Sequence, residues 1–297
     1  MKPASLIILS PLAGLYSVAT RARLIAYRRG WLSVSRLPVP VLSLGNLTVG
    51  GTGKTPLVEW VCRVVGENGM RVCVLTRGYG RINPQSQVLV SNGREVLADV
   101  AAAGDEPRLL AERLIGVAAV IANPNRFAAG KWAIANLGSE VFVLDDGFQH
   151  LRVKRDVDIV TLDATNPFGG GRLLPRGRLR EPAQSLRRAQ VIIITRSEQT
   201  ADIHSLKREV EQLSGRKNVL ISRTRTGAIR PLSHQTREPL SSPSSYRVAA
   251  FCALERLRRT AGRSLRTVCS PAGLRGAGTE AVWSLAHLVL YPMGALA

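Results

Sequence analysis

Residues 48–55 constrain this chain more than any other segment, because they read Thr-Val-Gly-Gly-Thr-Gly-Lys-Thr. An apolar run at 39–44 precedes them and predicts a buried strand, and residues 56–68 predict a helix. A strand, a glycine-rich turn, Gly-Lys-Thr and a helix, in this order, are typical of a phosphate-binding loop. One position departs from the usual pattern, since Thr48 stands where its first glycine is expected.

Each part of this loop has a physical reason to bind phosphate. Glycines let successive backbone N–H groups turn inward, and the helix N-terminus adds the positive end of its dipole. Lys54 can reach the β- and γ-phosphates, and the Thr55 hydroxyl can ligate Mg²⁺. The alternative is a glycine-rich turn that carries a lysine by chance. We predict that nucleotide is bound by the whole loop: Thr48, Val49, Gly50, Gly51, Thr52, Gly53, Lys54 and Thr55.

Strands alternate with helices along most of the remaining sequence. Further apolar strands are predicted at 71–76, 87–91, 117–122, 141–144, 157–162, 191–195, 219–222 and 248–251, and helices at 105–115, 126–137 and 202–213. Such alternation predicts an α/β fold with a doubly wound, mostly parallel sheet and helices on both faces. Ligands of these sheets bind at the carboxyl ends of the strands, where the motifs of this chain also fall.

Two pairs of acids follow predicted structural boundaries. Asp145 and Asp146 end the strand at 141–144, where a carboxylate can lie beside a metal ion held by the phosphate loop. Asp105 and Glu106 begin a helix, and capping alone explains acids there. A kinase also needs a carboxylate that accepts the proton of the attacking hydroxyl, so a catalytic role for this second pair stays open.

Basic residues dominate the charge of the chain. There are 41 Lys and Arg against 21 Asp and Glu, a formal charge of +20, which favours a nucleic acid, an anionic membrane or a phosphorylated substrate as partner. Aromatic residues make up only 5%, which argues against stacking on single-stranded nucleic acid. Residues 169–182 form a loop rich in glycine and arginine, which is either a solvated basic loop or, as we favour, an anion-binding loop.

The N-terminal segment is apolar and precedes a group of arginines. Residues 4–18 are interrupted by Pro11 and are too short for a transmembrane helix, and their charges follow the apolar part rather than precede it, unlike a cleaved signal peptide. A helix lying on an anionic membrane surface and a helix packed on the domain both fit. Since the four cysteines show no metal-ligand spacing, we expect reduced thiols in a cytoplasmic protein.

Together these segments resemble the tetraacyldisaccharide 4′-kinase family of lipid A biosynthesis. The resemblance covers roughly residues 5–252 and rests on six motifs in order: 45–56 around the phosphate loop, Arg-Gly-Tyr-Gly-Arg at 77–81, Gly-Asp-Glu-Pro at 104–107, Asn-Arg at 125–126, Leu-Asp-Asp-Gly-Phe-Gln-His at 144–150, and 171–182 in the arginine-rich loop. It implies a P-loop NTPase-type kinase that uses ATP and Mg²⁺ to phosphorylate the 4′-hydroxyl of tetraacyldisaccharide 1-phosphate, which gives lipid IVA.

The resemblance also implies roles for individual residues. Asp105 would be the catalytic acid–base residue, and Lys54, also placed in the catalytic set, would hold the β- and γ-phosphates. The metal shell would consist of Thr55, Glu106, Asp146 and Gln149. The residues in contact with substrate or with the transferring phosphate would be Tyr79, Arg126, Asp145 and Arg178. The partners would be an acidic glycolipid and the cytoplasmic face of the inner membrane, with no nucleic acid and no obligate protein partner.

The C-terminal part departs from the family. Family members carry a further lobe with an Asp-His-His motif, but residues 253–297 contain no Asp, Asn, Lys, Gln, Ile or Phe and a single histidine, His287. A frameshifted tail explains this composition, and a divergent lobe is the alternative. The organisation we expect is a membrane-surface region at 1–30, a core domain at 31–232, a linker and lobe start at 233–252, and an aberrant tail at 253–297.

Two classes of function fit these observations. The first is the lipid A kinase, with the activity of this chain reduced by its tail. The second is a P-loop protein that binds nucleotide without transferring phosphate to lipid, of the metallochaperone or regulatory-switch type. The arginine-rich loop favours the first class, and the lack of Cys or His pairs argues against the second.

Overall fold

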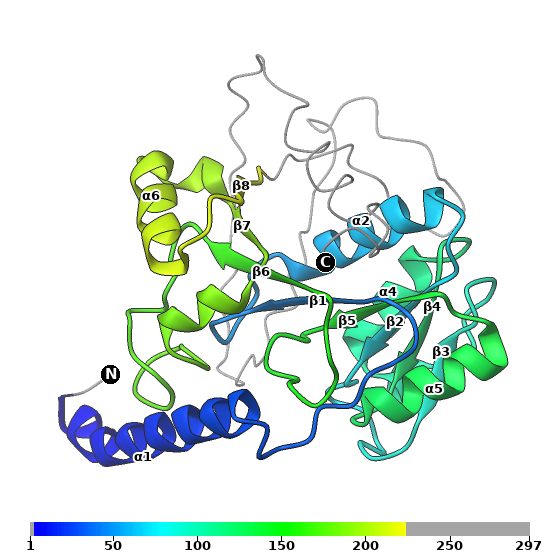
Figure 1. The fold of residues 1–297 in the computed structure, drawn as a ribbon, viewed down its shortest axis with the longest axis horizontal. Coiled ribbons are helices and arrows are strands. Elements are labelled where there is room, and N and C mark those ends of the chain that lie inside the picture. The colour runs from blue at the N-terminus through cyan, green and yellow to red at the C-terminus, as the bar shows by residue number, and fades with distance from the viewer. Residues whose placement is uncertain (1–2, 224–297) are drawn as a thin grey trace, which may run out of the picture.

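The structure of the chain is a computed structural model that describes residues 3–223. It contains one eight-stranded sheet with the strand order β3-β4-β2-β5-β1-β6-β7-β8 (Figure 1). Only the β3–β4 pair is antiparallel. The strands are β1 (Val41–Asn46), β2 (Val72–Thr76), β3 (Val88–Ser91), β4 (Ala118–Ala122), β5 (Val141–Asp145), β6 (Val157–Asp163), β7 (Val191–Thr195) and β8 (Val219–Ile221). The predicted α/β fold with a mostly parallel sheet is confirmed.

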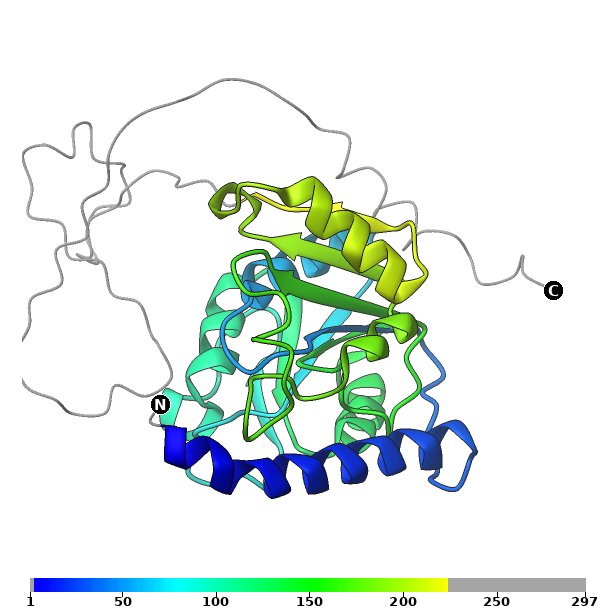
Figure 2. The same cartoon turned by 90° about the vertical axis from the view of Figure 1, so that its left-hand side faces the viewer.

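Helices pack on both faces of this sheet. They are α1 (Pro3–Arg28), α2 (Lys54–Glu67), α3 (Val100–Ala103), α4 (Asp105–Arg113), α5 (Arg126–Leu137) and α6 (Ile203–Ser214), with short 3-10 helices η1 (Ala183–Arg188) and η2 (Ser197–Gln199). α2 and α4 bury their apolar residues against one face. α5, η1 and α6 cover the other face, as the two views show (Figure 1 and Figure 2).

The core strands are apolar on both sides, which explains why their sequences lack alternation. Every residue of β1, β2, β4, β5 and β7 is buried. Parallel strands covered by helices on both faces have this composition. Cys62 of α2 and Cys73 of β2 lie inside this core as free thiols, and burial raises the pKa of both, to about 12 for Cys73. Both cysteines therefore lie in the core, and their reduced state stays a prediction.

Several predicted boundaries are corrected by the structure. The first strand begins two residues later than predicted, after Pro40, and continues to Asn46. α2 begins at Lys54, so that Pro56 lies in its first turn, where a missing N–H costs nothing. α1 runs unbroken through Pro11, which the sequence had suggested as an interruption. The strand expected at 248–251, the linker and the tail at 253–297 lie outside the described residues.

α1 lies along one side of the core, at the bottom of Figure 1 and Figure 2. Tyr16 donates its hydroxyl hydrogen to the carbonyl of Arg180, 2.9 Å away, and Arg23 donates to the carbonyl of Gln149, also 2.9 Å away. The helix is therefore attached to two loops at the sheet edge. No helix within residues 3–223 is long and apolar enough to cross a membrane.

Candidate active site

The glycine-rich loop connects β1, in the middle of the sheet, to α2. Gly50 and Gly53 have φ values of +117° and +75°, which L side chains rarely adopt. Gly53 directly precedes the first residue of α2, Lys54. The loop therefore curls over the helix N-terminus, and the lysine side chain begins where the backbone N–H groups of the first turn are unpaired within the helix.

Buried hydroxyl groups hold the loop from the β6–β7 side. Thr52 shares a hydrogen bond of 2.8 Å with Thr161, in the second half of β6. Thr195, at the end of β7, donates its hydroxyl hydrogen to the carbonyl oxygen of Thr52, 2.9 Å away. Asn46 donates to the Thr52 hydroxyl oxygen over 3.1 Å. These groups are neutral and buried, so they hold the loop in place through hydrogen bonds alone and add no charge beside the ligand.

Charged groups meet on the opposite, β5 side of the loop. The Lys54 ammonium lies 2.5 Å from a carboxylate oxygen of Asp146, and Arg180 donates to both oxygens of the same carboxylate at 2.8 and 2.6 Å. Burial would raise the pKa of Asp146, but the two cations outweigh it and the pKa is lowered. Asp146 also has a φ of +50°, unusual for a residue other than glycine.

The neighbouring carboxylate, Asp145, faces a different environment. It is buried and accepts a hydrogen bond of 3.2 Å from the hydroxyl of Thr76, at the end of β2. Burial is the main cause of its raised pKa, against the opposing effect of Lys54. The left-handed conformation of Asp146 directs the two acids to different partners. The Asp146 carboxylate therefore faces Lys54 of the phosphate loop, and the Asp145 carboxylate faces Thr76 of β2.

The arginine-rich loop is paired with the phosphate loop through backbone hydrogen bonds. Val49 N donates to Arg178 O over 2.8 Å, and Arg180 N donates to Leu47 O over 2.7 Å. The Arg178 guanidinium donates twice to the Val49 carbonyl, at 2.9 and 3.1 Å, and lies directly over Gly50. Arg178, expected to contact substrate, is thus held here on the backbone of the phosphate loop.

The other predicted residues lie on the β5–β2–β4 side. Asp105 and Glu106 are exposed in the first turn of α4. Gly104, with φ +90°, brings this turn within contact of the Tyr79 backbone, because a Cβ there would lie 2.5 Å from Tyr79 O. The Tyr79 ring is exposed, with the Arg77 guanidinium 5.2 Å from its centre.

Arg126 is buried at the start of α5 and faces the same edge. Burial lowers its pKa to about 10, and the negative charge of Asp145 is the main opposing influence. Its Nε has no hydrogen-bond partner among the described residues. The fold thus brings the predicted residues to one edge of the sheet, with the phosphate loop between its hydroxyl and charged flanks.

A protein-family model matches most of this chain. The family model described as tetraacyldisaccharide-1-P 4′-kinase matches residues 5–261. The chain belongs to this family.

Curated members of the family are similar to this chain over much of its length. Tetraacyldisaccharide 4′-kinase of Geobacter sulfurreducens is 47% identical over 184 residues, 62% of this chain and 52% of the relative. The protein of the same name from Pelobacter propionicus is 40% identical over 247 residues, 83% of this chain and 66% of the relative. The chain spans about half the length of the Geobacter sulfurreducens relative and of the relative of the same name from Anaeromyxobacter sp. Fw109-5.

A solved structure of a family member has the same fold. LpxK from Aquifex aeolicus, crystallised in complex with ATP, superposes with a TM-score of 0.62 at 38% identity, over 66% of this chain and 61% of that protein. The predicted P-loop NTPase-type fold is therefore confirmed.

The predicted metal shell contains oxygen donors of the kind that Mg²⁺ prefers. Thr55 supplies a hydroxyl, Asp146 a carboxylate and Gln149 an amide oxygen. In this structure both Asp146 oxygens accept from cations, and Gln149 donates from Nε2 to the Asn46 carbonyl at 3.0 Å. Residues 3–223 hold no cluster of three or more His, Cys, Asp or Glu side chains. The donor types fit Mg²⁺ if the Asp146 carboxylate gives up its ion pair with Lys54 or Arg180 and binds the metal instead.

Four residues of this site were not assigned a role from the sequence. Asn46, Thr161 and Thr195 support the phosphate loop, and Arg180 pairs with Asp146. The three supporting residues are polar side chains at or near the ends of apolar strands, which is a usable signal because parallel strands end at one edge. Arg180 had no signal that separated it from the other arginines of its loop.

His150 completes this edge, four residues after Asp146. Its pKa is lowered from 6.5 to about 4, mainly by burial and also by the nearby positive charges of Arg126, Arg155, Arg152 and Arg23. The imidazole is therefore neutral at pH 7, and a strongly positive environment surrounds it.

Proposed function

We propose that the chain is the core of an ATP-dependent 4′-kinase that phosphorylates tetraacyldisaccharide 1-phosphate. The observation that carries this proposal is the contact between Lys54 and Asp146 on the phosphate loop of a family member. A lysine that lies on a carboxylate at a helix N-terminus is placed to exchange that carboxylate for a nucleotide phosphate and a metal ion.

In this proposal the nucleotide phosphates occupy the loop at residues 48–55. Lys54 binds the β- and γ-phosphates, and Thr55, Glu106, Asp146 and Gln149 provide the ligands of Mg²⁺, which would neutralise charge on the transferred phosphoryl group. When Asp146 turns to the metal, Lys54 becomes free for phosphate. The ATP complex of the Aquifex aeolicus protein supports the choice of nucleotide.

The acceptor hydroxyl approaches from the side of β2 and β4. Asp105 is the residue proposed to take its proton, since an exposed carboxylate at a helix start can accept a hydrogen bond from a bound ligand. Tyr79, Arg126 and Asp145 are the residues proposed to contact the substrate on this side. The hydrogen bond from Thr76 holds the Asp145 carboxylate in place. Arg178 holds the phosphate loop by its bonds to Val49, next to Gly50, and its other N–H groups are the proposed donors to substrate.

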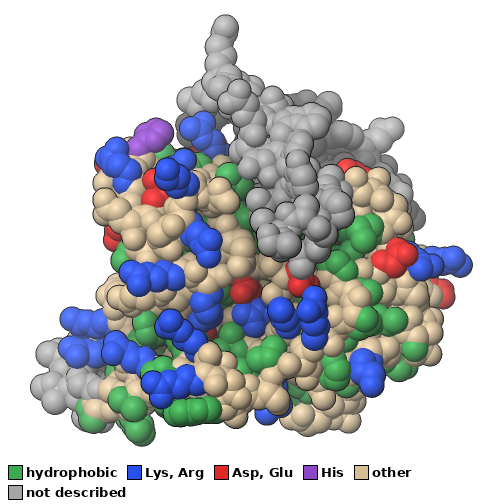
Figure 3. Space-filling model, in the orientation of Figure 1, with side chains coloured by type: hydrophobic (Ala, Val, Ile, Leu, Met, Phe, Trp, Pro, Cys, Tyr) green, Lys and Arg blue, Asp and Glu red, His purple; other side chains and the backbone are tan. Residues whose placement is uncertain are grey.

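The proposed location is the surface of an anionic membrane. Leu12, Leu15, Val18 and Ile25 of α1 are exposed apolar residues, and Arg21, Arg28 and Arg29 are exposed on the same helix and its end. Figure 3 shows apolar and basic side chains next to each other at the lower left, where α1 lies. This combination binds anionic lipid surfaces. The acceptor lipid would then be reached from the cytoplasmic face of the inner membrane.

A transfer assay tests the proposed function. Radiolabelled ATP and the disaccharide 1-phosphate are incubated with the chain as it stands, and with a chimera in which the residues after Cys252 come from the Geobacter sulfurreducens relative. We expect phosphate transfer by the chimera and little by the chain itself, because the tail at 253–297 lacks the family's Asp-His-His motif. Lys54→Ala in the chimera is the negative control.

The assay has an outcome that contradicts the proposal. A chimera that binds MgATP but transfers no phosphate to the lipid would support a nucleotide-binding protein of another class. Transfer by the unaltered chain at the rate of the chimera would instead show that residues 253–297 form a working lobe.

A further inference from the structure

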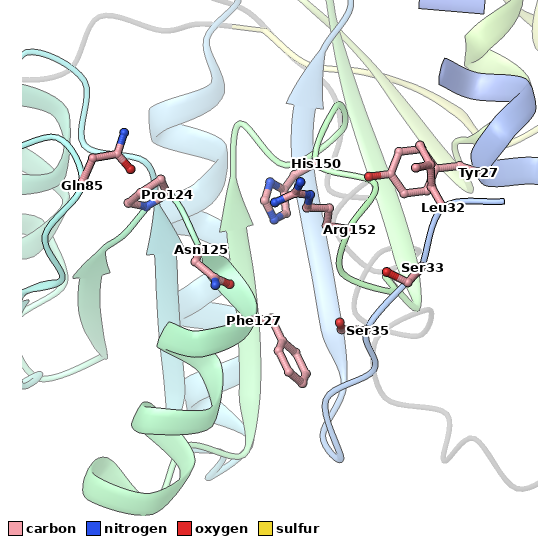
Figure 4. Close-up of a pocket in the computed structure, with 10 residues that line it drawn as sticks. All are labelled: Tyr27, Leu32, Ser33, Ser35, Gln85, Pro124, Asn125, Phe127, His150 and Arg152. Carbon is pink, nitrogen blue, oxygen red and sulfur yellow. The ribbon is translucent and has the colours of Figure 1, made fainter. Parts of the chain in front are cut away.

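A cavity lined by residues outside the phosphate loop has no role in the site described above. Its volume is about 430 Å³, and its walls come from the end of α1, the segment at 32–35, the start of α5 and the loop after β5 (Figure 4). We call it the Arg152 pocket, and its lining residues are Tyr27, Leu32, Ser33, Ser35, Gln85, Pro124, Asn125, Phe127, His150 and Arg152.

The Arg152 pocket is suited to an anion. Arg152 is its only charged lining residue, no carboxylate lines it, and no acid within residues 3–223 forms an ion pair with Arg152. Arg126 and Arg23 add positive charge close to His150. A solvent-accessible arginine without a counter-ion is a fitted partner for phosphate oxygens.

The start of α5 adds to the positive potential. Asn125, which lines the pocket, caps this helix by accepting a hydrogen bond from Ala128 N over 3.1 Å. α5 has 12 residues, so the positive end of its dipole faces the region of the cap. Arginine and helix terminus therefore act on the same cavity.

The remaining walls suit a sugar ring rather than a bare ion. Two aromatic side chains, Tyr27 and Phe127, lie at different sides of the cavity. The hydroxyl groups of Ser33 and Ser35 lie between them, and the Gln85 amide lines the far side (Figure 4). Aromatic rings supply apolar contact area, and hydroxyl and amide groups supply directional hydrogen bonds. An inorganic phosphate would leave most of this volume unused.

One short chain segment links the pocket to the charged cluster at the phosphate loop. Residues 145–152 form one continuous segment, in which Asp146 contacts Lys54 and His150 and Arg152 line the pocket. A disaccharide with a phosphate at position 1 needs two separate positions, one for the hydroxyl that receives phosphate and one for the phosphate that it already carries. The name of the family places such a phosphate on the acceptor.

We propose that the Arg152 pocket binds the glycosyl 1-phosphate end of the acceptor. This inference rests on the proposed function and adds the residues that select the substrate. Arg152 and the start of α5 bind the phosphate monoester, and Tyr27 or Phe127 packs against the sugar that carries it. An acceptor without this phosphate would lose these contacts and bind more weakly.

Calorimetry on the full chain without ATP tests the pocket. The probes are glucosamine 1-phosphate, glucosamine, glycerol 1-phosphate and inorganic phosphate. We expect glucosamine 1-phosphate to bind roughly tenfold or more tightly than each of the others. Arg152→Gln should weaken its binding roughly tenfold, and Arg94→Gln, an exposed arginine on the distant β3–β4 connection, should leave it unchanged.

A second variant guards against a general loss of structure. Ser33→Trp fills the cavity from an exposed position and should also weaken glucosamine 1-phosphate binding, with an unchanged thermal midpoint. Equal binding by wild type and Arg152→Gln, or no saturable binding of glucosamine 1-phosphate, would overturn the proposal. Equal affinity for inorganic phosphate or for glycerol 1-phosphate would do so as well, since it would indicate a free-anion site or a phospholipid headgroup site.

This experiment is independent of the transfer assay. Binding of glucosamine 1-phosphate together with an inactive chimera would contradict the proposed function and leave the pocket assignment intact. An active chimera whose chain does not bind the probe would contradict the pocket assignment alone.

Discussion

The two flanks of the phosphate loop are built from different chemistry. On the β6–β7 flank, Thr52, Thr161 and Thr195 form a buried network of neutral hydroxyl groups. On the β5 flank, Lys54, Asp146 and Arg180 form a partly exposed charged cluster. Neutral buried bonds are costly to leave unmade and so hold one geometry, whereas partly solvated ion pairs can exchange partners at low cost. The comparison indicates a fixed support on one side and a replaceable set of charges on the other.

The largest effect should follow from removal of the lysine on the charged flank. Lys54→Ala should weaken MgATP binding roughly 10- to 100-fold, because hydrogen bonds to a charged group contribute about 1.5–3 kcal/mol. Calorimetry with MgATP measures this, and Lys131→Ala on α5 is the matched control. Equal affinities for the wild type and Lys54→Ala would remove the phosphate-site assignment.

The neutral flank should respond in stability. Thr161→Val keeps the shape of the side chain but leaves Thr52 Oγ1 and the Gly45 carbonyl without their hydroxyl partner. We expect a loss of about 1–3 kcal/mol in the free energy of unfolding, measured by urea denaturation. Thr52→Val combined with Thr161→Val should cost less than the sum of both, since they share one bond. Full additivity would show that the network does not act as a unit.

Exchange of partners on the charged flank can be tested with Asp146→Asn. Without this carboxylate, Lys54 loses the acid with which it pairs and can turn to the nucleotide, so ATP without metal should bind about threefold to tenfold more tightly. The gain in affinity on addition of Mg²⁺ should fall at the same time. Asp202→Asn, at the cap of α6, serves as control because Asn preserves the cap. Weaker binding of metal-free ATP by Asp146→Asn would contradict the exchange.

The smallest effect concerns pH and His150, next to the charged flank. Its folded pKa of about 4 lies below the ordinary value of 6.5, so the unfolded chain binds a proton first as the pH falls. Stability should therefore decline between pH 6.5 and 4, by on the order of 1 kcal/mol after allowance for solvent screening of the partly buried ring. His150→Asn should reduce this slope in urea unfolding at several pH values. An unchanged slope would show that the ring is not titrating in this window.

The sequence predicted those parts of the molecule that depend on local patterns. The alternation of apolar runs and helices specifies an α/β sheet, because buried parallel strands need apolar residues on both faces. The phosphate loop was found because its glycines, Lys54 and Thr55 are neighbours along the chain and act through one turn of backbone. The acids after β5 were found for the same reason. Their individual roles stay predictions.

Tertiary contacts decided what each of these groups faces. The alternation of elements does not define the strand order, and only that order brings Thr161 and Thr195 under the loop. Asp145 and Asp146 are adjacent in sequence, yet a φ of +50° at Asp146 sends them to different partners. Arg178 and Arg180 lie two residues apart, and one binds backbone while the other binds the carboxylate.

Sequence alone therefore determined the class of fold and the loop that binds phosphate, since both arise from residues close together in the chain. The structure decided the two flanks of that loop and the Arg152 pocket, whose walls come from segments between residues 27 and 152. Side-chain direction and the meeting of distant segments depend on packing of the whole sheet, and no local pattern in the sequence encodes them.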